Sequence, residues 1–163
     1  MIHRAGDRDG FGLTKLFKVL WFFEAKRFSI EHETFSGAEY TRDEHGPRPT
    51  LAYTLLPELE ASGAIQRYSE RYYNHDLRRA RSLRPPATGL LNEDQARDLE
   101  YWINYVDGVS ATQISEESHD YGWEIAKQGE KLPLVAFLAS RVRDPNQDEL
   151  AWAKERAKAL GLP

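Results

Sequence analysis

The stretch Leu13-Thr-Lys-Leu-Phe-Lys-Val-Leu-Trp-Phe-Phe-Glu-Ala-Lys-Arg27 decides how the rest of this chain folds. Its apolar side chains recur at helical spacing, at positions 13, 16, 17, 20 and 23. Val19, Trp21 and Phe22 widen the apolar surface almost all the way round. A helix that is apolar on every side must be covered on every side. We therefore expect this helix at the centre of the core, with a covering partner protein as the alternative.

Further helices are expected on both sides of this one. Leucines at positions 51, 55, 56 and 59 predict the buried face of a helix that opens near Pro49 or Thr50, and Pro57 should kink or restart it. Gly63 is suited to terminate that helix, because glycine adopts a positive φ without strain. Asn92 with Gln95, and Ser110 with Gln113, form capping pairs that predict two helix starts. Two more helices are expected over 132–142 and 147–160.

One β-hairpin interrupts this helical pattern. Apolar and polar residues alternate over 65–73, residues 74–76 are typical of a turn, and a second strand is expected over 77–83. Gly37 marks another turn, and Gly46 and Pro47 fix the backbone of a third, since Gly46 permits φ > 0. The predicted fold class is mainly α: a compact single-domain helical bundle with a small β-hairpin or short strands. Residues 1–12 should be a flexible N-terminal lead-in, and 13–163 the single domain.

Composition narrows the possible classes of protein. The chain has 163 residues, of which 40% are hydrophobic and 29% charged, and it lacks cysteine. A disordered chain, a disulfide-rich miniprotein and a thiolate metal site are thereby excluded. The polar start shows no secretory signal, and the longest apolar run is too short to span a bilayer. We therefore expect a cytoplasmic protein that does not associate with membranes.

Residues suited to catalysis or to metal binding are sparse. The five histidines form neither an HxH pair nor an i,i+4 pair, so no local arrangement begins a zinc site. Motifs for nucleotide binding or for nucleophilic hydrolysis are missing as well. We expect no enzyme activity, no metal and no cofactor, and a structural role for each histidine.

Between positions 67 and 84 lie six arginines, interleaved with three tyrosines: Arg67, Arg71, Arg78, Arg79, Arg81 and Arg84, with Tyr68, Tyr72 and Tyr73. Three interpretations stay open. The cluster is suited to an acidic protein surface, because Tyr and Arg dominate interface hot spots. It is also suited to a phosphate backbone with stacked bases. Alternatively, the arginines pair with the acidic second half of the chain, where 91–163 holds 8 Lys and Arg against 14 Asp and Glu.

Several short motifs follow one another in a specific order. They are Leu13-Thr-Lys-Leu-Phe-Lys-Val-Leu-Trp21, Ser36-Gly-Ala-Glu-Tyr40, His45-Gly-Pro-Arg-Pro49, Gly63-Ala-Ile65, Leu91-Asn-Glu-Asp-Gln95, Ser110-Ala-Thr-Gln-Ile114, Ser118-His119 and Trp123. Their order and spacing, from about residue 12 to about residue 143, resemble the Panacea domain of the SocA-like antitoxin family. The chain departs from the family pattern at His45, where an aromatic residue is more common, and at Pro57, which interrupts a helix.

The resemblance implies a small, mostly helical domain that neutralises a neighbouring toxin by direct binding, without identifying that toxin. It also implies a structural role for His119. The residues that we expect to contact the toxin lie around the Gly46-Pro47 turn and on the hairpin: Tyr40, Arg42, Arg48, Tyr72, Tyr73, Arg78 and Arg79. If the toxin presents a basic groove, an acidic face is the alternative: Glu93, Asp94, Asp98 and Glu100. A nucleic-acid-binding regulator that uses the segment Arg67–Arg84 is the alternative function; it predicts an affinity that falls steeply with salt.

Overall fold

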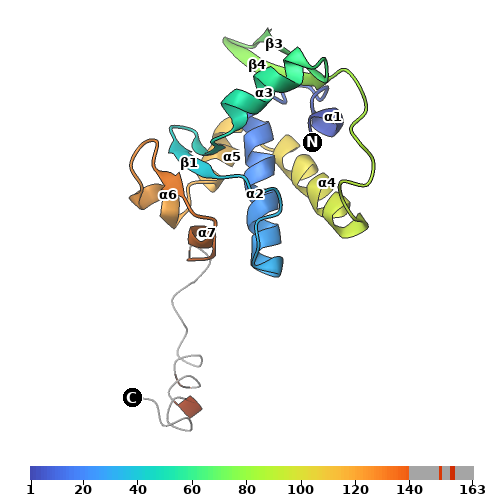
Figure 1. The fold of residues 1–163 in the computed structure, drawn as a ribbon. Helices are drawn as coiled ribbons and strands as arrows, with labels where there is room; N and C mark the ends of the chain where they lie inside the picture. Colours follow the sequence, from blue (N-terminus) through green and yellow to red (C-terminus); the bar gives the residue numbers. More distant parts are fainter. Residues whose placement is uncertain (140–150, 152–154, 157–163) are drawn as a thin grey trace.

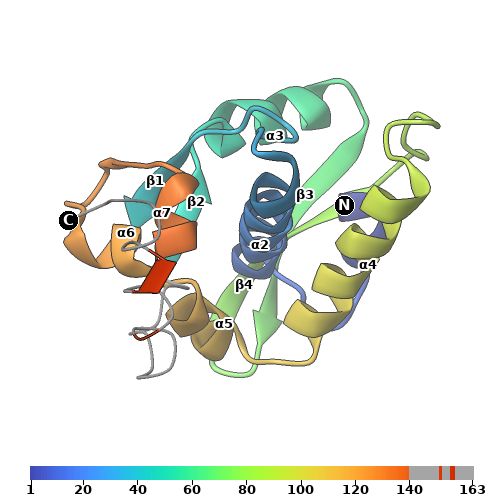
Figure 2. The same ribbon diagram turned by 90° about the horizontal axis from the view of Figure 1, so that it is seen from below.

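A computed structural model describes residues 1–139, 151, 155 and 156 of the chain. Helix α2 (Leu13–Glu31) runs through the middle of the molecule. Around it lie α4 (Glu93–Asp107) along one side, α5 (Ala111–Glu117) across one end, and two small β-sheets (Figures 1 and 2). Helix α2 contacts α4, α5, α7, β2 and β4 directly, so it is the element around which the described fold is arranged.

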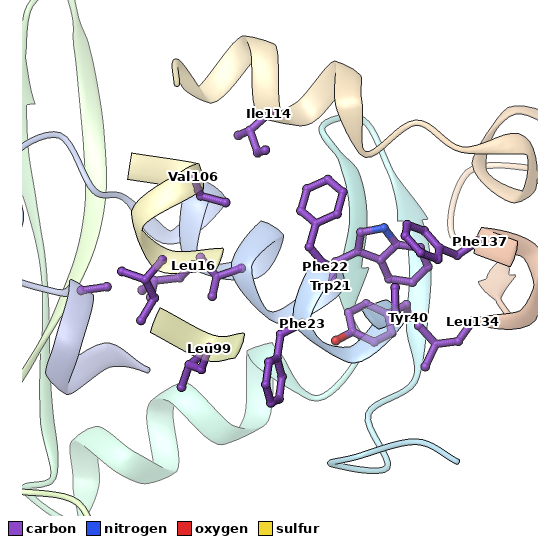
Figure 3. Packing of buried hydrophobic residues seen from close by; sticks show 14 of the residues in the cluster. Leu16, Trp21, Phe22, Phe23, Tyr40, Leu99, Val106, Ile114, Leu134 and Phe137 are labelled. Atoms are coloured by element: carbon purple, nitrogen blue, oxygen red, sulfur yellow. The ribbon is translucent and has the colours of Figure 1, made fainter. Parts of the chain in front are cut away.

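The core forms around α2, as its all-round apolar pattern predicts. Trp21 is fully buried and meets the rings of Tyr40 and Phe137 edge-on (Figure 3). The other side of α2 packs against α4, which contributes Leu99, Ile103 and Val106. The helix ends at His32, whose φ of 59° is left-handed. The central position expected for this helix is thus confirmed.

The expected fold class, a mainly helical bundle, is wrong. Of the described residues, 48% are helical and 18% lie in strands, and the strands form two antiparallel sheets, so the fold is mixed α and β. One sheet has the order β2-β1-β5, made of Gly46–Pro49, Tyr40–Asp43 and Lys131–Leu132. These strands are two to four residues long, and β5, one of the two partners of β1, lies about ninety positions away along the chain. A period of two cannot be read from pieces so short.

The hairpin is confirmed almost to the residue. Strand β3 (Ile65–Tyr72) pairs with β4 (His75–Ser82) in antiparallel register, and Tyr72 opposes His75 next to the turn. Helix α3 (Ala52–Ala61) precedes it and continues through Pro57. Gly63, with φ of 68°, ends this helix: its N–H and that of Ala64 donate to carbonyls of the last turn. Yet Ala52 is the only buried residue of α3, and its leucines are half-buried or exposed.

The N-terminal segment packs onto the body of the protein, although we expected a flexible lead-in. It holds the short helix α1 (Ile2–Ala5), and both Ala5 and Phe11 are fully buried. Arg8 binds two carboxylates of α4, those of Glu100 and Asp107. The buried apolar side chains at positions 5 and 11 are too widely spaced to give a helical period. This is why the sequence of residues 1–12 resembles that of a loop.

The capping predictions are confirmed in the second half of the chain. Asn92 and Gln95 form a reciprocal capping box on α4, and the Ser110 hydroxyl accepts from the N–H of Gln113 on α5. Two short helices follow, α6 (Tyr121–Ile125) and α7 (Val135–Ala139). The helix expected over 147–160 lies outside the described residues, except for 151, 155 and 156. Among the helices that the structure describes, none combines the length and apolar character needed to cross a bilayer.

Candidate functional site

A cleft of about 870 Å³ opens between the first half of α2, the β1–β2 turn, α3, the hairpin and α5. Both signs of charge line it: Lys15, Lys18, Arg48, Arg67, Arg78 and Arg79 against Asp43, Glu44, Glu60, Asp76 and Glu116. The near balance distinguishes this cleft from a phosphate-binding groove, which carries a clear excess of positive charge. Residues between positions 10 and 119 meet here, so the cleft joins the start of α2, the consecutive elements from β1 to β4, and α5.

A buried lysine forms the floor of the cleft. The Lys18 side chain is only 2% exposed, and its Nζ donates to the carbonyl oxygen of Pro47 at 3.3 Å. Burial lowers the pKa of Lys18 to about 7, because removal from water disfavours the charged ammonium, while the carboxylate of Asp43 opposes this effect. Sequence reasoning missed Lys18, which merely interrupted an apolar run. The signal was there: a lysine inside a helix predicted to be covered on every side must be buried.

Gly46 allows the β1–β2 turn to approach this lysine. Its φ is +92°, a conformation that side chains disfavour. A Cβ at this position would overlap both Ser118 Oγ and Lys18 Nζ, so the space is closed to any larger residue. The structure thus confirms the positive φ expected at Gly46, and it adds a packing reason that the sequence could not provide.

Aromatic stacking joins α6 to the same turn. The His119 ring lies parallel to Trp123, with centroids 3.6 Å apart, and the Arg42 guanidinium lies 4.0 Å from the Trp123 ring centroid. Arg42 Nε donates to the Trp123 carbonyl oxygen and Trp123 Nε1 to that of Asp43, each at 2.9 Å. Burial, aided by the charges of Lys18 and Arg42, lowers the pKa of His119. His119 and Arg42 therefore hold the turn against α6.

Two of the predicted contact residues lie inside the protein. Tyr40 is 1% exposed and packs edge-on against Trp21 in the core. Arg79 is buried too: it forms an ion pair with Glu70 and donates to the backbone carbonyl oxygens of Gly6 and Arg8. In this conformation, neither side chain is open to a partner protein.

Other predicted contact residues lie at the surface. Arg48 and Arg78 line the cleft, and Arg48 stacks on the exposed ring of Tyr53, which sequence reasoning also missed. Tyr72 and Tyr73 sit edge-on at the hairpin tip, where Tyr73 is 82% exposed with φ of 51°. Of the seven predicted contact residues, therefore, Arg48 and Arg78 are the two that line the cleft and have exposed or half-buried side chains.

Three of the six clustered arginines form ion pairs with nearby carboxylates, and a fourth donates to an amide. Arg67 pairs with Glu60, Arg71 with Asp76 and Arg79 with Glu70, while Arg81 donates to Gln66. Among the described residues, Arg78 and Arg84 have no ion pair or side-chain hydrogen bond. The acidic second half pairs instead with arginines near the N-terminus, since Arg27 binds Asp98 and Arg4 binds Glu100. Within the part of the chain that the structure describes, no arginine of the cluster pairs with the second half; the ion pairs that form are with Glu60, Glu70 and Asp76 instead.

Comparison with known proteins gives one match. The family model for the SocA-like antitoxin, Panacea domain, matches residues 16–124. That range extends from α2 into α6 and includes Lys18, Gly46 and the His119–Trp123 stack. Neither the curated proteins nor the solved structures contain a match to the chain. The chain belongs to the family of SocA-like antitoxins that carry a Panacea domain.

Proposed function

We propose that this protein is the antitoxin of a toxin–antitoxin pair and that it neutralises its cognate toxin by direct protein–protein binding, without turnover. The observation that carries the proposal is the family match over 16–124, two thirds of the chain, which covers the helices and strands that build the cleft. A neutralising antitoxin needs a surface that covers the active site of the toxin or holds the toxin in an inactive conformation.

The cleft and its rim support a protein partner. Arg48 stacked on Tyr53, and the unpaired Arg78, are residue types that recur as interface hot spots. The mixed charge of the lining suits the polar rim of a protein interface. A nucleic-acid partner, by contrast, would find most of the arginines between 67 and 84 already occupied by neighbouring carboxylates or amides. We therefore favour the protein partner.

Co-expression tests this proposal. The product of the adjacent gene would be induced in a bacterial host, alone and with this protein. We expect arrest of growth in the first case, restored growth in the second, and a stoichiometric complex on size-exclusion chromatography of the purified pair. A product that stays toxic beside the intact, soluble antitoxin contradicts the proposal. Titration with duplex DNA of the upstream region at low salt separates the two classes of partner, because we expect no complex with it.

A further inference from the structure

A second, smaller concavity of about 370 Å³ lies where α2, α4 and α5 meet. Its lining is almost entirely aromatic: Phe22, Tyr101, Trp102, Tyr105 and the carboxylate of Glu117. We call these five residues the aromatic groove. It shares no lining residue with the cleft, and α5 contributes to both, since Glu116 lines the cleft and Glu117 the groove.

The rings of the groove have a defined arrangement. Tyr101 and Tyr105 are nearly parallel, at 14°, with centroids 6.3 Å apart. Trp102 stands almost perpendicular to both, at 79° and 88°. Behind it, Phe22 stacks on Trp102 at 5.0 Å and is itself buried in the core. Because the buried ring fixes Trp102, the groove is largely formed before any partner arrives.

One carboxylate completes the groove. Glu117 accepts hydrogen bonds from the Tyr105 hydroxyl at 2.7 Å and from Gln113 Nε2 at 2.9 Å. These bonds orient the carboxylate without neutralising it, and within the described part of the chain no basic side chain pairs with it. The same bond raises the pKa of Tyr105 and keeps its hydroxyl a donor. A negative charge thus sits beside electron-rich rings.

Exposure indicates that this face is open. Tyr101 is 59% exposed, although its ring contacts Trp102 and Tyr105. Exposed aromatic clusters are uncommon on a monomeric surface and mark interaction sites. Among the described residues, Glu117 has no ion pair, so the groove itself carries an uncompensated negative charge. This charge favours a basic partner over an acidic one.

We infer that the aromatic groove receives an arginine or lysine side chain of the toxin, an inference that rests on the proposed function. A cation within about 6 Å of a ring centroid is attracted to the face of the ring, and Glu117 adds a charge-assisted hydrogen bond. A purely apolar side chain would leave that carboxylate without a partner. Because Phe22 holds Trp102 and the hydrogen bond to Glu117 holds Tyr105, less ordering of these two side chains is needed on binding.

A peptide titration tests the groove without the toxin. Acetyl-Gly-Arg-Gly-amide would be titrated into the full chain, with the citrulline peptide, which has the same shape but no charge, as its control. We expect the arginine peptide to shift the indole N–H resonance of Trp102 and the citrulline peptide to leave it in place. Glu117→Gln removes the charge and retains one acceptor oxygen for one of the two hydrogen bonds. It should abolish the shift, whereas Glu58→Gln on α3 should not. Equal shifts from both peptides overturn the inference.

Affinity for the toxin provides the second test. We expect Glu117→Gln and Tyr101→Leu each to raise the Kd of the complex roughly ten-fold, while Glu58→Gln leaves it unchanged. Unaltered amide spectra of the variants would show that the fold is kept. If the wild-type chain fails to bind the toxin, the proposed function fails. If the wild-type chain binds and Glu117→Gln binds equally well, the groove alone is refuted.

Discussion

The ammonium group of Lys18 has little room to change its environment. Gly46, the Pro47 carbonyl and Ser118 lie against it, with the Asp43 carboxylate and the His119 ring nearby. A lysine so enclosed is costly to charge, because burial removes its water. Its role in this fold is to donate to a turn carbonyl that would otherwise lack a partner at the base of the cleft.

Replacement of Lys18 by methionine should therefore change how stability depends on pH. The folded pKa of about 7 lies below the ordinary 10.5, so between these values the unfolded chain binds more protons than the folded one. This group then makes the free energy of unfolding rise with pH from about 7 to about 10. Lys18→Met should flatten that slope, because the group that titrates is removed. Urea denaturation from pH 6 to above 9 measures the slope for both proteins, and equal slopes would contradict the expectation.

Gly46 and Gly37 offer a matched pair of substitutions. Both have positive φ, at +92° and +70°, but only Gly46 is crowded by side chains, whereas the space around Gly37 is open. Gly37→Ala should cost about 1 kcal/mol, the strain of the backbone alone. Gly46→Ala should cost roughly 2–4 kcal/mol, because Lys18 and Ser118 must move as well. Equal losses in the free energy of unfolding, measured by chemical denaturation, would show that an added Cβ at position 46 meets no steric obstacle.

At the scale of elements, neighbouring arginines of the hairpin have opposite roles. Arg79 is buried, pairs with the half-buried Glu70 carboxylate and donates to two backbone carbonyls of the N-terminal segment. Arg78 lines the cleft and has no ion pair within the described part of the chain. Arg79→Ala should lower the free energy of unfolding by roughly 1–3 kcal/mol, since it leaves two backbone carbonyl oxygens and the half-buried Glu70 carboxylate without a donor. Arg78→Ala should leave stability within about 0.5 kcal/mol. Thermal denaturation of the two variants measures this difference in stability. Similar melting temperatures would contradict the different roles of Arg78 and Arg79.

Among the helices and strands, the sequence predicts those features that depend on residues close together in the chain. The α4 capping box, the Gly63 stop and the β3–β4 hairpin depend on residues a few positions apart, and all three are confirmed. Sheet β2-β1-β5 depends on a pairing between distant segments, which no local pattern encodes. The buried face predicted for α3 is wrong for another reason: its leucines follow a helical period, but the helix packs mainly against β3 and leaves them half-buried or exposed.

For the candidate site, the sequence predicted which segments border the cleft, but not the role of each residue in them. It singled out the Gly46-Pro47 turn and the arginine-rich hairpin, and both do border the cleft. It could not separate Arg78 from Arg79, because the two alternate across a strand and only the packing of the N-terminal segment decides which is buried. Tyr101, Trp102 and Tyr105 were missed as a group, since their significance depends on Phe22 and Glu117 from other helices.

Over the whole molecule, the cleft and the aromatic groove both border α5 and share no lining residue. Each exposes a charge without an ion pair among the described residues: the positive Arg78 in the cleft and the negative Glu117 in the groove. A toxin that covers α5 would engage both, and contacts without shared partners contribute to affinity independently. We therefore expect the double variant Arg78→Ala, Glu117→Gln to weaken the toxin complex by the product of the two single factors, measured by calorimetry. If the double variant binds the toxin as tightly as the single variant with the lower affinity, the toxin uses one concavity only. If the combined loss falls short of the product while both singles count, the two contacts are coupled through α5.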